Sequence, residues 1–193
     1  AESTTGTPLG DDEQQSIETY QKGVEITDQA TQEFLNELDA LDKPVTVVFY
    51  GDHLPGIYSS ASEDDNNSLA LHLTDYFIWS NKASSSQGNK ASDAAYSSPN
   101  FFVAQAADHM NAKVSPYLAF LTEMPSKIAA MEPPVVNNIQ GWDRIPEGQN
   151  IYLDQDGKPM AEKDLDAETK QLLADYRLIQ YDITAGKNYL KST

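Results

Sequence analysis

The run Val45–Tyr50 (VTVVFY) constrains the fold of this chain more than any other segment. It follows Asp42-Lys43-Pro44, where the proline ends a helical pattern, and it is rich in β-branched side chains and too short for a helix. The run lacks polar alternation, which is typical of strands that are covered on both faces and pair in parallel. We therefore expect a buried, parallel strand here.

The residues on either side of this strand predict a second strand and a long helix. Apolar residues recur three and four positions apart between Asp12 and Leu41, which indicates an amphipathic helix, and Gly23 with Thr27-Asp28 offers a cap for a second helix in its middle. Tyr76–Ser80 (YFIWS) predicts the second strand.

The later part of the chain carries clear start signals for helices. Ser98-Pro99 and Ser115-Pro116 each combine an N-cap residue with a first-turn proline, so a helix is expected after each. Asp156-Gly157 predicts the turn of a hairpin within Ile151–Met160, and Asp166 is expected to cap a last helix over residues 168–181. The first of these helices is expected to bury four side chains: Phe102, Val103, Ala106 and Met110.

Together these elements predict an α/β fold. We expect a largely parallel sheet flanked by helices, with a small antiparallel hairpin near the end. No internal repeat or linker divides the chain, so residues 1–193 are expected to form one domain. The small, polar residues 1–11 are expected to be disordered.

Composition excludes several classes of function. The chain has 13 Lys and Arg against 30 Asp and Glu, a net charge of −17, so it lacks the basic surface that nucleic-acid binding needs. It has no cysteine, which excludes disulfides and thiolate chemistry. Its sequence contains no apolar run of the length that spans a membrane.

Two candidate metal ligands follow the first strand. Gly51-Asp52-His53 places a carboxylate and an imidazole at the end of a strand, where α/β sheets bind their ligands. Such a pair suits Mn²⁺, Zn²⁺ or a related ion once further ligands complete the site. The residues by themselves leave a second interpretation open, in which Asp52 caps the next turn and His53 packs locally.

Other chemistry-bearing residues fit structural roles better. We expect His72 and His109 to be structural or exposed, since His109 lies at a helix end where the dipole favours an imidazole. Asp154–Gly157 resembles the start of a calcium loop but lacks its final glutamate, so a hairpin turn explains it better. Trp79 is expected in the core, and Trp142 keeps a chance of a surface function.

The segment VVFYGDHLP resembles the strand and metal-ligand motif of the lipoteichoic acid synthase and phosphoglycerol transferase family, within the alkaline phosphatase and sulfatase superfamily. Tyr76–Asn81 is similar to the next strand of that family. The segments that begin at Ser98 and Ser115, and the closing Tyr176–Tyr189, resemble its last segments in the same order. The resemblance covers residues from about 20 to 189 and implies the carboxy-terminal part of the catalytic domain.

The resemblance implies a function for the longer protein. Its members transfer glycerol phosphate from phosphatidylglycerol to an acceptor such as polyglycerol phosphate, using a divalent metal that is expected to be Mn²⁺, with Mg²⁺ or Zn²⁺ as alternatives. Asp52 and His53 correspond to two metal ligands. The family's threonine nucleophile precedes this strand, and Thr4, Thr5 and Thr7 lie in no strand that would present them. We therefore expect the amino-terminal half of the domain to be missing and this chain alone to be inactive.

The resemblance also implies a location on the outer face of a bacterial cytoplasmic membrane, with the anchor outside this segment. Two alternatives remain for the activity: a sulfatase or phosphodiesterase of the same superfamily, or a scaffold or binding domain that has the fold without the chemistry.

Overall fold

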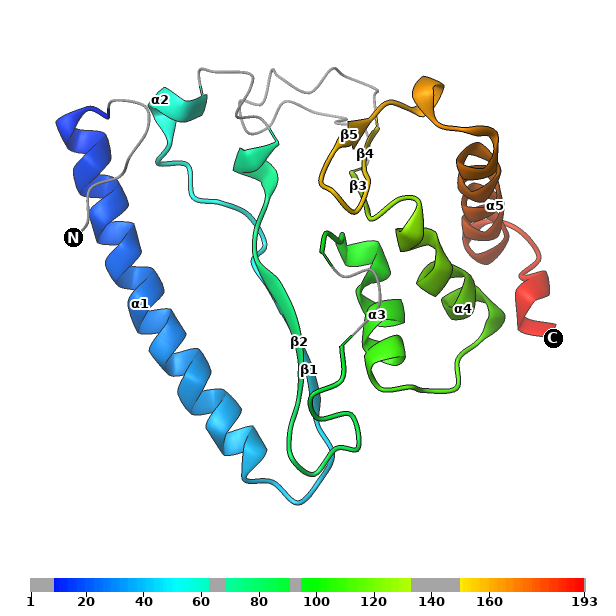
Figure 1. The fold of residues 1–193 in the computed structure, drawn as a ribbon, viewed down its shortest axis with the longest axis horizontal. Helices are drawn as coiled ribbons and strands as arrows, with labels where there is room; N and C mark the ends of the chain where they lie inside the picture. The colour runs from blue at the N-terminus through cyan, green and yellow to red at the C-terminus, as the bar shows by residue number, and fades with distance from the viewer. Residues whose placement is uncertain (1–8, 63–68, 91–94, 133–149, 193) are drawn as a thin grey trace. The chain divides into compact units, whose positions relative to one another are not determined.

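The computed structural model describes residues 9–62, 69–90, 95–132 and 150–192. It divides the chain into two compact units, one ending at Gln87 and the other beginning at Gly88. Both units contain helices and strands, which confirms the mixed α/β class (Figure 1). The single domain expected over residues 1–193 stays a prediction.

The first unit contains a long helix, two paired strands and two short helical turns. Helix α1 spans Asp11–Asp39 and runs through Gly23 without a break, so Asp11, expected in the disordered start, is helical. Three acidic residues in its first turn are favoured by the positive end of the helix dipole. The other elements are β1 (Thr46–Tyr50), α2 (Ser59–Ser62), η2 (Ala70–His72) and β2 (Tyr76–Ser80).

The two strands of this unit pair antiparallel, contrary to the parallel pairing expected from their apolar sequences. The register runs from Thr46 opposite Ser80 to Tyr50 opposite Tyr76. A parallel pair needs a crossover of a dozen or more residues, usually a helix, whereas the described part of the 51–75 connection holds only short turns. Every strand pairing of the described residues is antiparallel, so the largely parallel sheet is not seen there.

The side chain of Asn81, directly after β2, joins the end of α1 and the following turn to the start of the β1 segment. Its Nδ2 donates to the carbonyl oxygens of Leu38, at the end of α1, and Lys43, in the following turn, at 2.9 Å each. Its Oδ1 accepts from the amide of Val45 at 3.0 Å, and its own amide donates to the Val45 carbonyl at 3.0 Å. Asn81 is fully buried, so these bonds satisfy polar groups that water cannot reach.

Apolar side chains of the first unit are not buried. Among its described residues the buried side chains are all polar: Ser80, Asn81 and Ser86. On α1 the apolar stripe predicted from the sequence is present, yet Phe34 is 53% exposed and Val24 is 48% exposed. Polar contacts therefore fix the geometry of this unit.

The second unit combines helices with a small antiparallel sheet. Its helices are α3 (Phe102–His109), α4 (Pro116–Glu123) and α5 (Ala167–Thr184), and its short helical turns are η3 (Pro99–Phe101), η4 (Met124–Ser126), η5 (Glu162–Asp164) and η6 (Tyr189–Ser192). The strands β3 (Ala130–Glu132), β4 (Ile151–Leu153) and β5 (Pro159–Met160) lie in that order.

Local signals placed two of these elements correctly. The hairpin between β4 and β5 turns at Gly157, whose positive φ of 74° suits glycine. The carboxylate of Asp166 accepts from the amide of Thr169 at 2.7 Å and caps α5 as expected. Both predictions are confirmed.

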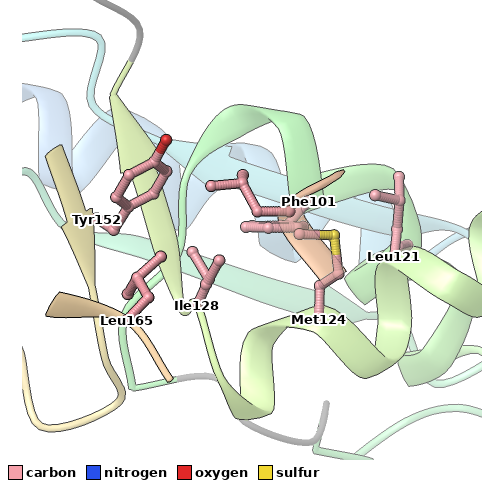
Figure 2. Close-up of a cluster of buried hydrophobic side chains, with 8 residues drawn as sticks. Phe101, Leu121, Met124, Ile128, Tyr152 and Leu165 are labelled. Carbon is pink, nitrogen blue, oxygen red and sulfur yellow. The ribbon is translucent and has the colours of Figure 1, made fainter. Parts of the chain in front are cut away.

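The hydrophobic core lies in the second unit. Figure 2 shows a cluster of buried side chains drawn from its helices and its hairpin. The cluster contains Phe101, Ala104, Leu121, Met124, Ile128, Tyr152, Leu165 and Leu173. Helices α3 and α4 pack against each other, and small alanines on α3 allow their close approach.

The buried face of α3 differs from the one expected. Val103 is 65% exposed and Met110 is also exposed, whereas Ala104 and Ala107 are buried with Phe101. The buried positions 101, 104, 105 and 109 follow the three-and-four spacing of one face of an α-helix, and this face includes the polar Gln105 and His109. The wrong face was predicted because the larger apolar residues were assumed to point inward.

A polar cluster joins α5 to the hairpin at the rim of this core. The Tyr152 hydroxyl points away from the apolar cluster (Figure 2), and it accepts from Arg177 Nη2 at 3.1 Å and from Asn150 Nδ2 at 2.8 Å. Arg177 also donates to both carboxylate oxygens of Glu162 at 2.7 Å. These bonds from Arg177 hold the pKa of Glu162 below its ordinary value.

We expect Asn81→Ala to weaken the first unit by about 2 to 3 kcal/mol, because it removes the partner of the Val45 amide and of the Lys43 carbonyl and one of two bonds to the Leu38 carbonyl. Hydrogen exchange measures this locally: the Val45 amide should exchange roughly 30-fold faster. Asn36→Ala, an exposed asparagine on α1, is the matched control. Unchanged exchange at Val45 in Asn81→Ala would show that the amide does not hold the strand.

We expect Glu162→Gln to lower the free energy of unfolding by about 1 kcal/mol near pH 7, since the bidentate pair is half-exposed and partly screened. The folded-state pKa of Glu162 lies below its ordinary 4.5, so its contribution is complete above pH 4.5 and is lost as pH falls through the folded value. Denaturant titrations between pH 3 and pH 7 test this. The exposed Glu123→Gln is the control, and a difference that persists at the lowest pH would contradict the assignment.

Candidate metal centre

The candidate site begins where β1 ends. The amide of Gly51 donates to the Asp75 carbonyl at 3.1 Å, and the Thr74 hydroxyl donates to the Gly51 carbonyl at 2.7 Å. Two residues before Gly51 on β1, the ring of Phe49 stacks on that of Phe77 with centroids 5.0 Å apart. These contacts fix the end of the strand from which Asp52 and His53 project.

Asp52 and His53 hold each other and the adjacent backbone in one arrangement. Asp52 Oδ1 accepts from the His53 amide at 2.8 Å, which leaves Oδ2 at 3.5 Å from His53 Nε2. His53 Nδ1 lies 3.0 Å from the Leu54 carbonyl oxygen. Because a carbonyl only accepts, this bond places the proton on Nδ1, and in the neutral ring Nε2 then carries a free lone pair.

The two free donor atoms fit a single divalent metal ion. Metal–donor distances of about 2.1 Å, at angles between a right angle and the tetrahedral value, place two ligand atoms about 3.0 to 3.4 Å apart. Oδ2 and Nε2, at 3.5 Å, are close to that spacing without further movement. The side chains are 85% and 73% exposed, so both can reach an ion or another part of a protein.

The described residues bring together two candidate ligands at this site. Within the ranges that the structure describes, no group of three or more His, Cys, Asp or Glu side chains could enclose a metal. Two ligands bind a metal weakly, so a complete site needs donors beyond this pair. Asp52 also has a local role, since its Oδ1 accepts a hydrogen bond from the His53 amide.

The loop that leaves His53 is anchored at its far end to α1. The Ser60 amide, in α2, donates to Glu13 Oε1 at 2.9 Å, and the Ser60 hydroxyl donates to Glu13 Oε2. These hydrogen bonds hold the pKa of Glu13 below its ordinary value. Sequence reasoning missed Glu13 and Thr74, because their partners lie 47 and 23 positions away.

The residues that we set aside lie in structural settings. His109 is buried at the end of α3, and its carbonyl accepts from Asn89 Nδ2 at 3.0 Å. The Asp154 carboxylate accepts from the amides of Asp156 and Lys158 at 3.0 and 2.9 Å, so it closes the hairpin turn. His72 is half-buried in η2, whereas Trp79, expected in the core, is only half-buried in β2, and the described residues around it form no apolar core. Trp142, Thr4, Thr5 and Thr7 lie outside the described residues.

None of the helices in the described part of the chain has both the length and the apolar character needed to cross a membrane. The outer-face location suggested by the resemblance therefore stays a proposal.

Comparison with known proteins shows which family this chain belongs to. The chain is similar to the phosphoglycerol transferase GacH of Streptococcus pyogenes, solved in complex with sn-glycerol-1-phosphate, with a TM-score of 0.66 and 33% identity. The match covers 97% of this chain and 40% of GacH. This match confirms the resemblance to phosphoglycerol transferases drawn from the sequence.

A second relative is a cyclic beta-1,2-glucan modification protein of Rhizobium meliloti (strain 1021), which is 24% identical over 194 residues. That match covers 94% of this chain and 27% of the relative, so the chain spans less than half the length of either protein. The family model described as Sulfatase matches residues 1–112, more than half of the chain. The chain therefore belongs to the sulfatase family.

Proposed function

We propose that this chain is part of an extracellular, metal-dependent phosphoglycerol transferase and that Asp52 and His53 are two ligands of its metal. The observation that carries the proposal is the arrangement of this pair, in which Oδ2 and Nε2 lie 3.5 Å apart and Nδ1 is held by the Leu54 carbonyl. A histidine ligand in metalloproteins commonly donates its other ring nitrogen in this way.

The proposed ion is Mn²⁺, with Zn²⁺ and Mg²⁺ as alternatives. A carboxylate oxygen binds all three ions, and an imidazole nitrogen favours a transition metal over Mg²⁺, so the choice of Mn²⁺ over Zn²⁺ rests on the resemblance to phosphoglycerol transferases. The chain's net charge of −17 also attracts cations toward its surface. When bound, such an ion would lower the pKa of a hydroxyl nucleophile and offset negative charge on the phosphate.

The residues of this chain would have limited and distinct tasks in that reaction. Asp52 would contribute the negative charge that retains the cation, and His53 would contribute a neutral nitrogen ligand with a fixed ring orientation. The nucleophile and the remaining ligands would come from residues other than this pair. In the proposed reaction a hydroxyl oxygen bonds to phosphorus as the diacylglycerol oxygen leaves, and an acceptor hydroxyl then displaces the enzyme.

The relatives support glycerol phosphate as the transferred group. GacH is named a phosphoglycerol transferase and was solved with sn-glycerol-1-phosphate. The Rhizobium relative is named for the modification of a glucan. These names support glycerol phosphate as the transferred group and suggest a glycan as an acceptor to test beside polyglycerol phosphate, whereas phosphatidylglycerol as donor follows from the resemblance in the sequence.

A second candidate function is hydrolysis of a sulfate ester, which the description of the family model favours. Sulfate and phosphate esters present similar tetrahedral anions to a metal, so the ligand pair alone does not separate them. A protein that keeps the fold without catalysis is the third possibility, and a direct assay separates all three.

We expect the intact protein that contains this chain to release diacylglycerol from phosphatidylglycerol when Mn²⁺ is present. Asp52→Asn and His53→Gln should each lower kcat/KM at least about 100-fold, because loss of a ligand costs more than loss of a group that only orients one. Asp28→Asn, an exposed carboxylate on α1, is the control and should retain activity.

The same preparations distinguish the alternatives. Turnover of an aryl sulfate without release of diacylglycerol would support the sulfatase interpretation. A protein that turns over neither ester would support the scaffold. Full activity in both ligand variants would remove Asp52 and His53 from the site.

We expect neutral His53 to carry its proton on Nδ1, because the Leu54 carbonyl accepts from that atom. Nitrogen-15 NMR of the ring distinguishes a protonated nitrogen from one with a free lone pair, and added Zn²⁺ should shift the Nε2 resonance. A proton on Nε2 in the metal-free chain would contradict the proposed ligand atom.

A further inference from the structure

Thr74, in the segment that leads into β2, holds Gly51, the residue that precedes the two proposed metal ligands. Thr74 lies two positions before β2, and its hydroxyl donates to the carbonyl of Gly51 at 2.7 Å. If the register of β1 and β2 is continued past Tyr50 and Tyr76, Thr74 falls opposite Asp52. The Thr74 hydroxyl therefore supplies a hydrogen bond between the two segments where the backbone pairing of β1 and β2 ends.

The contact between these two residues is close as well as polar. A Cβ atom added to Gly51 would lie 2.9 Å from Thr74 Cβ, nearer than real Cβ atoms approach, and 3.2 Å from its Cγ2. Glycine is thus required at position 51 for the threonine to sit against the backbone. The amide of Gly51 is held on its other side by the Asp75 carbonyl.

This contact determines the orientation of the next peptide. The Gly51 carbonyl belongs to the peptide group that it shares with the Asp52 amide, so a hydrogen bond to that oxygen restricts rotation of the plane from which Asp52 starts. The Asp52 side chain is itself highly exposed, and its bond to the His53 amide stays within the same turn. The turn therefore takes its direction from Gly51.

We propose that Thr74 is a positioning residue for the metal site: its hydroxyl fixes the Gly51–Asp52 peptide and so directs Asp52 Oδ2 and His53 Nε2 toward one ion. The inference rests on the proposed function, since it assigns Asp52 and His53 as ligands. Thr74 does not itself contact the metal in this assignment. Its effect reaches the ligands through the backbone.

The test is the Mn²⁺ affinity of the intact protein that contains this chain, measured with Mn²⁺ alone. Thr74→Val keeps the shape of the side chain and removes the hydroxyl, so the dissociation constant should rise about tenfold, the usual effect of losing a group that orients a ligand. Thr74→Ser keeps the hydroxyl and should stay within about threefold of the original protein. Activity lost in Thr74→Val at low Mn²⁺ should return at saturating Mn²⁺.

The chain offers a closely matched control in Thr27. Its hydroxyl also donates to a glycine carbonyl, that of Gly23 at 3.0 Å, but on the exposed surface of α1. Thr27→Val should leave Mn²⁺ affinity unchanged. If Thr74→Val does not fold, Thr74→Ala removes the same hydroxyl with a smaller side chain and should show the same tenfold loss.

A purely structural threonine gives a different pattern. Thr74→Val would then lower the melting temperature of the metal-free protein with no change in the Mn²⁺ dissociation constant, and that result would overturn the inference. Unchanged Mn²⁺ affinity in Asp52→Asn and His53→Gln would overturn the proposed metal site itself. Loss of affinity in those two variants, with normal affinity in Thr74→Val, would reject the role of Thr74 alone.

Discussion

The geometry of the first unit depends on the buried side-chain amide of Asn81. It binds the last carbonyls of α1, the turn that follows and the first amide of the β1 segment, and no apolar core of described residues assists it. A buried amide without these partners would raise the free energy of the folded state, so the arrangement that provides them is strongly favoured. The register of β1 against β2 follows from this closure, and the position of Asp52 follows from the register.

The contrast between the two units has a physical basis. The second unit buries aromatic and aliphatic side chains from three helices and a hairpin, as expected for a small self-contained core. The first unit presents apolar residues on α1 and a half-exposed ring pair at the end of its strands. Helices of this kind gain most of their stability by packing an apolar face. This exposure supports the proposal that the chain works within a longer protein.

Local signals in the sequence predicted local structure well. The apolar runs gave β1 and β2, Asp166 gave the start of α5, and Asp156-Gly157 gave the hairpin. The sequence did not reveal which distant residues pair with each other. An apolar run does not specify the direction of its partner, and α3 buries Gln105 and His109 beside small alanines while Val103 is exposed. The roles of Asn81 and Thr74 exist only through residues far along the chain.

The same distinction explains why the proposed metal ligands could be selected from the sequence and the residues that support them could not. Asp52 and His53 are adjacent, so their mutual geometry is largely set by one peptide bond and one hydrogen bond. Their direction in space is set by Gly51, which is held by Thr74 and Asp75 from a segment more than 20 positions later. In the proposed site, the orientation of Asp52 and His53 is fixed, but these two residues do not make a complete set of metal ligands. The affinity of the site for metal must therefore depend on the donors that the rest of the protein brings to it.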